Sequence, residues 1–230
     1  KEALHCFGPK ASAASIPPSV AVAPEAPSTA PITQLQVVPA EFALSPGQSQ
    51  TFTVYGLDAA GRRVRAVSSE ATFAKFIPPT ALVKSEVDAE IVGNVIKTTS
   101  TSKMSAGQIQ VKWNNLVGIT RGRIVAGLGY RENFESLPLG QKNEAAEDVG
   151  FPPLAWLGAR VKWHALEKDG SKVLANRLDT ILFQRTMNFI GKSEMNNYTL
   201  EADVMTDGTR RVMSSVGLVN QRYLIPIKAG

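Results

Sequence analysis

Cysteine and histidine are scarce in this chain of 230 residues. Cys6 is the single cysteine, so the chain cannot form an internal disulfide or a zinc site that needs two thiolates. The two histidines, His5 and His164, lie far apart in the sequence. A histidine-based metal site or a Ser-His-Asp triad has almost no residues to draw on. We therefore expect this chain to hold no metal and no cofactor.

Long apolar runs and basic clusters are also missing. No stretch of about 18 apolar residues is present, so the sequence predicts no helix that spans a membrane. The net charge is +5, but the basic residues are scattered, and their longest cluster is Arg62-Arg63-Val64-Arg65. Nucleic-acid binders more often carry a basic stripe with aromatic residues between the charges, so we expect no nucleic-acid partner. The first seven residues resemble the interior of a protein, so we expect no signal peptide there.

The pattern that the chain does show repeatedly is the period of two that is typical of strands. From Tyr198 to Met205, apolar residues alternate with polar ones, which predicts a strand with one buried face. A second alternating run covers residues 212–227, and Asp207-Gly208 between the two runs is a hairpin signal. The C-terminal part therefore predicts an antiparallel β-scaffold.

Two segments precede the first predicted domain. Residues 3–7 form a short apolar run that stops at Gly8-Pro9. This run, Leu4-His5-Cys6-Phe7-Gly8, resembles the strand that closes the repeat array of pyrroloquinoline-quinone-binding-like β-propeller proteins. The resemblance implies that residues 1–9 end an upstream propeller; the alternative is a strand that packs on a neighbouring domain. Residues 10–31 are rich in Ala, Ser and Pro, which predicts a semi-rigid linker between domains.

Residues 32–126 have the strand and turn spacing of a β-sandwich. Phe52 and Val54 are expected to point to one face of a strand, and Asp58-Ala59-Ala60-Gly61 predicts a turn. Later strands are predicted at residues 71–75, 90–97, 107–113 and 118–125. The Val37-Val38-Pro39 opening, the Leu44-x-x-Gly47 turn and the Phe52-x-Val54 strand resemble those of bacterial immunoglobulin-like domains. The resemblance implies an immunoglobulin-like sandwich that has no disulfide.

Residues 127–230 predict a second β-rich domain, with a strand at residues 130–134 and a hairpin turn at residues 167–170. The segment resembles the concanavalin A-like (laminin-G-like) jelly rolls that are attached to the same propeller proteins. The resemblance is carried by Phe134-Glu135, Trp156, residues 185–191, residues 197–203 and residues 217–223. Such a jelly roll usually needs more chain than this segment contains. We therefore expect that further chain, or a partner chain, completes the sandwich.

One pair of carboxylates offers candidate acid–base chemistry. Glu201 and Asp203 share one face of the predicted strand at a spacing of about 6.5 Å, which suits glycoside hydrolysis. The alternative, which we favour, is a solvated strand face. A calcium site would need several clustered oxygen ligands, and the sequence has no Asp-x-Asp-x-Asp spacing.

The candidate ligand-binding residues are Trp163, Asn220 and Arg222. An aromatic ring such as that of Trp163 suits the apolar face of a pyranose, and Asn220 and Arg222 would share a face of one strand and supply polar contacts. Trp156 lies between Leu154 and Leu157 and is more readily explained as a core residue. Trp163 could equally be a core residue. Asn220 and Arg222 could equally belong to a polar surface that binds no ligand.

Taken together, the sequence predicts an all-β chain: an immunoglobulin-like sandwich followed by a concanavalin-like jelly roll, preceded by a linker. The resemblances imply a non-catalytic, extracytoplasmic interaction module that recognises carbohydrate or mediates adhesion, at the periplasm, the cell surface or outside the cell. One alternative is a structural subunit of a cell-envelope assembly that pairs with other proteins through its sheet edges. A second alternative is a glycoside-processing enzyme.

Overall fold

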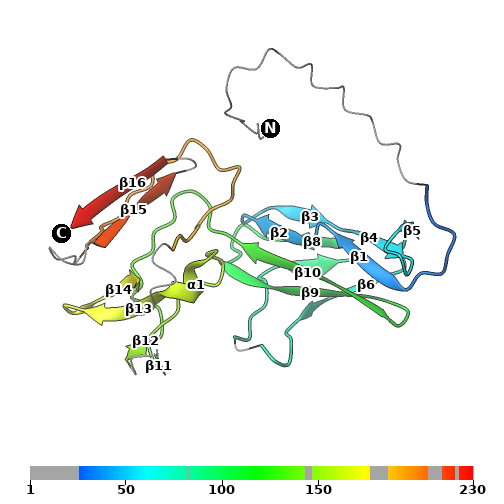
Figure 1. Ribbon diagram of the computed structural model, residues 1–230, viewed down its shortest axis with the longest axis horizontal. Coiled ribbons are helices and arrows are strands. Elements are labelled where there is room, and N and C mark those ends of the chain that lie inside the picture. Colours follow the sequence, from blue (N-terminus) through cyan, green and yellow to red (C-terminus); the bar gives the residue numbers. More distant parts are fainter. Residues whose placement is uncertain are drawn as a thin grey trace, which may run out of the picture.

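The computed structural model describes residues 26–81, 83–142, 147–176, 186–206, 214–220 and 223–229. In these residues the secondary structure consists of strands and one four-residue helix, so the predicted all-β class is confirmed (Figure 1). The predicted end of a propeller, residues 1–9, and most of the predicted linker lie outside the described residues. No helix in the described part of the chain has both the length and the apolar character needed to cross a membrane.

The first layer of the sandwich is built around one interrupted strand. β4 (Thr53–Leu57) pairs antiparallel with β1 (Gln34–Val38) and with β5 (Arg63–Ala66). β3 (Ser49–Thr51) precedes β4 directly and pairs with β8 (Val95–Lys97). β8 in turn pairs with β7 (Glu90–Val92), which is the outer strand of that sheet.

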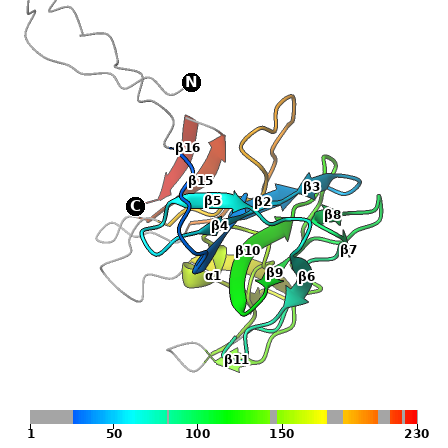
Figure 2. The ribbon, with the colours of Figure 1, turned by 90° about the vertical axis from the view of Figure 1, so that its right-hand side faces the viewer.

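The second layer is a four-stranded sheet in the order β2-β10-β9-β6. Its strands are β2 (Glu41–Leu44), β10 (Leu116–Ile124), β9 (Ser105–Trp113) and β6 (Thr72–Phe76). β2 runs parallel to β10, whereas the other pairs are antiparallel. Only two residues separate β1 from β2, so the chain passes from the first layer to the second there. Figure 2 shows β4 and β5 on one side of the sandwich and β10, β9 and β6 on the other.

The two layers enclose one apolar core. Phe52 lies at its centre, with its ring 5.5 Å from that of Phe42 in an edge-to-face arrangement and 6.2 Å from that of Phe73 in a stacked one. The predicted inward direction of Phe52 and Val54 is confirmed, because both are almost fully buried. The other buried members are Val37, Phe42, Leu44, Val67, Val87, Ile96, Ile109, Val111 and Ile124. Burial of this apolar surface is the main favourable contribution to the stability of the sandwich.

Most predicted strands of the sandwich are present, with one correction. The run at residues 90–97 is two strands, β7 and β8, joined by a turn at Gly93-Asn94. Gly93 has φ +58°, a conformation that side chains with a Cβ rarely adopt, and this permits the tight turn. The apolar residues on both sides of this turn therefore concealed a hairpin.

The predicted turn at residues 58–61 is confirmed and is built on the buried carboxylate of Asp58. Asp58 Oδ1 accepts hydrogen bonds from the backbone N–H of Ala60 and of Arg62, each at 2.9 Å. Its Oδ2 accepts a bond from Nε of Arg62 at 3.0 Å. Ser28, near the end of the predicted linker, donates its backbone N–H to the carbonyl of Arg63 at 2.8 Å. The hydroxyl of Ser28, together with the groups of Arg62 and Ala60, lowers the pKa of Asp58 to about 2.

This lowered pKa predicts an acid-sensitive contribution to stability. The ordinary pKa of 3.8 applies to the unfolded chain, so the stabilisation is complete above about pH 4 and is lost as the pH falls towards 2. In Asp58→Asn we expect lower stability at neutral pH and a smaller loss of stability between pH 4 and pH 2, measured by urea unfolding. Glu70, whose pKa is also lowered to about 2 by Arg65 and Trp113, retains part of the acid dependence. Asp169→Asn, in an exposed turn, is the control and should leave the profile unchanged; an unchanged profile in Asp58→Asn would contradict the assignment.

In the described residues of the second half, the strands pair as two-stranded ribbons. They pair β11 (Gln141–Lys142) with β12 (Asp148–Val149), β13 (Trp163–Lys168) with β14 (Ser171–Asn176), and β15 (Ser214–Asn220) with β16 (Tyr223–Ala229). A short helix, α1 (Ala159–Lys162), precedes β13. The predicted hairpin turn at residues 167–170 is confirmed, with Asp169 at φ +53° and Gly170 at φ +82°. A jelly roll over residues 127–230 stays a prediction, because the described strands do not join into one sandwich.

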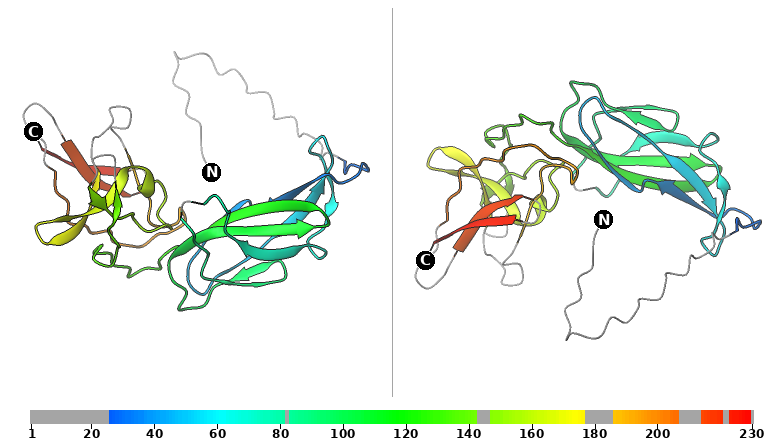
Figure 3. Two further views of the ribbon diagram at one scale, coloured as in Figure 1. Left: turned by 90° about the horizontal axis from the view of Figure 1, so that it is seen from below. Right: turned by 90° about the horizontal axis from the view of Figure 1, so that it is seen from above.

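The ribbons lie beside one end of the sandwich (Figures 1 and 3). Arg123, near the end of β10, donates from Nη1 to the carbonyl oxygen of Ala155 at 2.9 Å. Lys192, whose side chain is 9% exposed, donates from Nζ to Oε1 of Gln48 at 2.8 Å. Both contacts join the two halves through charged donors at positions that are far apart in the sequence.

Three predictions in the second half are wrong in detail. Residues 198–205 have no regular secondary structure, although their alternation predicted a strand. Residues 130–134 form no strand either, and Phe134 has φ +63°, which an extended strand cannot contain. The run at residues 212–227 is divided between β15 and β16, which pair with each other. The hairpin signal at Asp207-Gly208 lies outside the described residues.

Candidate functional site

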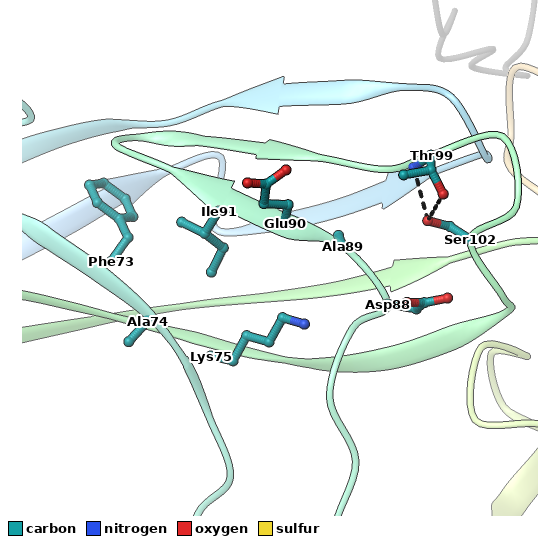
Figure 4. Close-up of a pocket in the computed structure, with 9 residues that line it drawn as sticks. All are labelled: Phe73, Ala74, Lys75, Asp88, Ala89, Glu90, Ile91, Thr99 and Ser102. Atoms are coloured by element: carbon teal, nitrogen blue, oxygen red, sulfur yellow. Dashed lines mark hydrogen bonds between the residues drawn. The ribbon is translucent and has the colours of Figure 1, made fainter.

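A groove of about 540 Å³ opens between β6 and β7, the outer strands of two different sheets (Figure 4). Apolar side chains and polar ones share its walls. The lining residues are Phe73, Ala74, Lys75, Asp88, Ala89, Glu90, Ile91, Thr99 and Ser102. The groove is thus an open flank of the sandwich.

The groups in the groove already serve the structure of the sandwich. Phe73 stacks on Phe52 and so belongs to the core. Oδ2 of Asp88 accepts the backbone N–H of Lys103 at 2.6 Å, and Oγ of Ser102 accepts the backbone N–H of Thr99 at 3.0 Å. Lys75 extends across the opening (Figure 4). A charged side chain on an outer strand opposes the addition of a further strand.

A second hollow, of about 200 Å³, has a different composition. It lies where residues 196–198 meet the β15–β16 hairpin, and its walls are formed by amide and phenol side chains. The lining residues are Asn196, Asn197, Tyr198, Asn220 and Tyr223. None of these five side chains carries a charge at neutral pH. We refer to this hollow below as the Asn–Tyr cleft.

Local backbone geometry positions the side chains of the Asn–Tyr cleft. Asn220 ends β15 and Tyr223 begins β16, and the two are direct cross-strand partners. Asn197 has φ +54°, a left-handed conformation that Asn tolerates better than most residues. Tyr198 donates its hydroxyl to Oδ1 of Asn220 at 2.8 Å and thereby joins the irregular segment to the hairpin.

Of the two predicted ligand residues that the structure describes, Asn220 lines the Asn–Tyr cleft and Trp163 does not. Trp163 begins β13, is half-buried and does not line the cleft; among the described residues its buried indole N–H has no hydrogen-bond partner. Arg222 lies outside the described residues. Trp156 is 6% exposed and packs edge-to-face on Phe134 at 6.0 Å, which confirms its core role.

The carboxylate pair does not have the geometry that the sequence predicted. Glu201 and Asp203 are both exposed and lie in the irregular segment, so no strand places them on a common face. His164 lies on β13 with its ring 5.8 Å from that of Phe151. In the described part of the chain, no three His, Cys, Asp or Glu residues come together in a way that could hold a metal ion.

Sequence reasoning missed four of the five residues that line the Asn–Tyr cleft. It treated residues 212–227 as one strand, which placed Tyr223 on the face opposite Asn220. The pairing of β15 with β16 instead makes the two residues neighbours. The signal that could have indicated the remaining wall is the run Asn196-Asn197-Tyr198, because consecutive asparagines favour turns over strands.

Comparison with known proteins gives little similarity. No family model and no curated protein matches the chain. Two solved structures that match are those of the surface layer protein SbsC, domains 1-6, and of the S-layer protein rSbsC(31-844). Each is 13% identical, with a match that covers 74% of this chain and 26% of the other and has a TM-score of 0.29. The chain therefore spans about a quarter of the length of these proteins, and a TM-score this low does not establish a shared fold.

Proposed function

We propose that the chain is a non-catalytic interaction module of an extracytoplasmic protein and that it recognises carbohydrate. The Asn–Tyr cleft is the observation that carries this proposal. Amide and phenol groups can both donate and accept hydrogen bonds, as sugar hydroxyls do, and exposed aromatic rings offer an apolar face. A small open hollow with such walls suits a ligand that is held at the surface of the protein.

The domain assignment is part of the same proposal. In the first sandwich, β1 pairs antiparallel with β4 while β2 pairs parallel with the last strand, β10. This division of the first segment between two layers supports an immunoglobulin-like domain at residues 32–126. The extracytoplasmic location, the upstream propeller and the jelly roll rest on the sequence resemblances alone.

The test of carbohydrate recognition is a glycan array probed with the full chain. We expect binding to a subset of glycans, and we expect the Tyr223→Ala variant to lose most of that signal because it removes the exposed ring of the cleft. Leu224→Ala changes the next residue of β16, which is also exposed but does not line the cleft, and should bind like the unmodified chain. An array without any hits would overturn the proposal.

A second candidate function is a structural subunit that pairs with other proteins through β16. The observation that favours it is the apolar exposure of this strand: Tyr223 is 74% exposed, and Leu224 and Ile225 are each 63% exposed. Concentration-dependent assembly of the unmodified chain that disappears in Ile225→Lys would support this candidate. Monomeric behaviour at every concentration would exclude pairing between copies of this chain through β16.

The enzymatic alternative can be tested at the same time. Hydrolysis of a glycan that binds on the array, and its disappearance in Glu201→Gln, would replace the non-catalytic proposal. We expect no hydrolysis, because Glu201 and Asp203 are exposed and lie on an irregular segment that holds them in no common strand geometry.

A further inference from the structure

The hydrogen bonds of the Asn–Tyr cleft determine which of its polar atoms remain available. Oδ1 of Asn220 accepts the hydroxyl of Tyr198, which leaves both Nδ2 hydrogens of Asn220 as donors. Asn197 donates from Nδ2 to Oδ1 of Asn196 at 3.0 Å, so its own Oδ1 remains an acceptor. Nδ2 of Asn196 donates to the carbonyl of Glu194 at 3.1 Å. The cleft therefore offers hydrogen-bond donors from Asn220, at the end of β15, and a hydrogen-bond acceptor from Asn197, in the irregular segment.

This arrangement matches the chemistry of neighbouring sugar hydroxyls. A hydroxyl group both donates and accepts, so two adjacent hydroxyls can bond to an amide donor and to an amide acceptor at the same time. The hydroxyl of Tyr223 can bond in either sense. A ligand with only acceptors, such as a phosphate, would leave the Asn197 oxygen without a partner.

The aromatic part of the cleft is asymmetric. Tyr223 is 74% exposed at the rim, whereas Tyr198 is half-buried and is bonded to Asn220. The exposed ring of Tyr223 can lie against the C–H face of a pyranose. This contact is favourable because it removes apolar surface of both groups from water. Tyr198 instead positions the Asn220 amide.

No charged side chain lines the cleft among the residues that the structure describes. The nearest acidic residue in the sequence, Glu194, accepts a bond from the hydroxyl of Ser193 at 2.9 Å and lies 3.8 Å from Nζ of Lys192. No group of three metal-binding side chains is present in the part of the chain that the structure describes. Calcium, which several sugar-binding sites use, needs a cage of oxygen ligands with carboxylates among them.

We infer that the Asn–Tyr cleft binds a single neutral pyranose unit without a metal ion, with Tyr223 against the sugar ring and with Asn220 and Asn197 bonded to adjacent hydroxyls. This inference rests on the proposed function and specifies the class of ligand for the same site. The cleft, at about 200 Å³, is smaller than the roughly 300 to 1,000 Å³ of sites that enclose a drug-sized ligand. It therefore selects one terminal unit of a longer glycan.

The test is saturation-transfer NMR on the full chain with the methyl glycosides of glucose, mannose, galactose and N-acetylglucosamine, and with methyl glucuronide as the anionic probe. We expect at least one neutral glycoside to bind, with a Kd on the order of 1 mM. Binding should persist in EDTA and in roughly 0.5 M salt, where charge interactions are strongly screened.

Variants separate the roles of the individual residues. Tyr223→Ala and Asn220→Ala should each raise the dissociation constant at least about tenfold, while Tyr198→Phe should raise it only a few-fold, because it releases the Asn220 amide without removing it. Leu224→Ala should have no effect. A need for calcium, a preference for the glucuronide, or full binding by Tyr223→Ala would overturn this inference while leaving carbohydrate recognition in place. Absence of any glycan binding on the array would remove both proposals.

Discussion

Replacing Phe52 by alanine should lower the stability of the sandwich by about 3 to 5 kcal/mol, the range typical of a large aromatic residue removed from a core. Phe52 is 1% exposed and contacts the rings of Phe42 and Phe73, one from each of two strands of the opposite layer. The substitution removes apolar surface and leaves a cavity that the two layers can close only by moving. Because domains are stable by only about 5 to 15 kcal/mol, this is a large part of the total.

Amide hydrogen exchange of the full chain measures this effect locally. Protection of the β4 and β9 peptides should fall by about a hundred-fold to a few thousand-fold in Phe52→Ala, if these strands open with the whole sandwich. Phe52→Leu keeps most of the volume and should cost about 1 to 2 kcal/mol, so it remains informative if the alanine variant does not fold. Leu128→Ala, at a position that is 65% exposed, should change protection very little. Equal protection in Phe52→Ala and the unmodified chain would show that the core lies elsewhere.

The first sandwich could be predicted well because its signals are local. Each strand has one buried face, so alternation identifies it, and turns such as the one at Asp58 depend on residues that are adjacent in the sequence. The 90–97 hairpin was nevertheless missed. Its turn needs only Gly93 and Asn94, and the apolar residues on both sides give the appearance of one continuous strand.

The second half was harder to predict, because alternation shows which face of a strand is buried and does not show which strand it pairs with. Residues 198–204 alternate as a strand should, yet among the described residues they pair with nothing in regular structure. The Asn–Tyr cleft is formed by such contacts between segments that are distant in the sequence. Tyr198 and Asn220 are 22 positions apart, and their hydrogen bond exists only because the irregular segment returns to the hairpin. Spacing along a strand cannot reveal such a contact.

The second large effect concerns β16, which among the described residues pairs with β15 alone and leaves its other edge open. Pro226 lies opposite Gly217 in the β15–β16 pair. Proline has no N–H, so it fits there only if its nitrogen points away from β15, towards the unpaired edge. A strand that paired with this edge would find no backbone N–H donor at Pro226, in the middle of β16. Pro226 therefore opposes the addition of a further strand to this edge of β16.

Pro226→Val should consequently convert the chain to concentration-dependent assemblies. The substitution restores the donor and makes residues 223–227 an uninterrupted, uncharged run of high β-propensity, in which Ile227 is 53% exposed. Sedimentation velocity on the order of 100 μM should show species larger than the monomer, whereas the unmodified chain should remain a monomer. Pro226→Lys restores the same donor but adds a charge at the edge, so it should stay monomeric. Assembly of both variants would assign the effect to the donor alone, and assembly of neither would mean that Pro226 does not protect this edge.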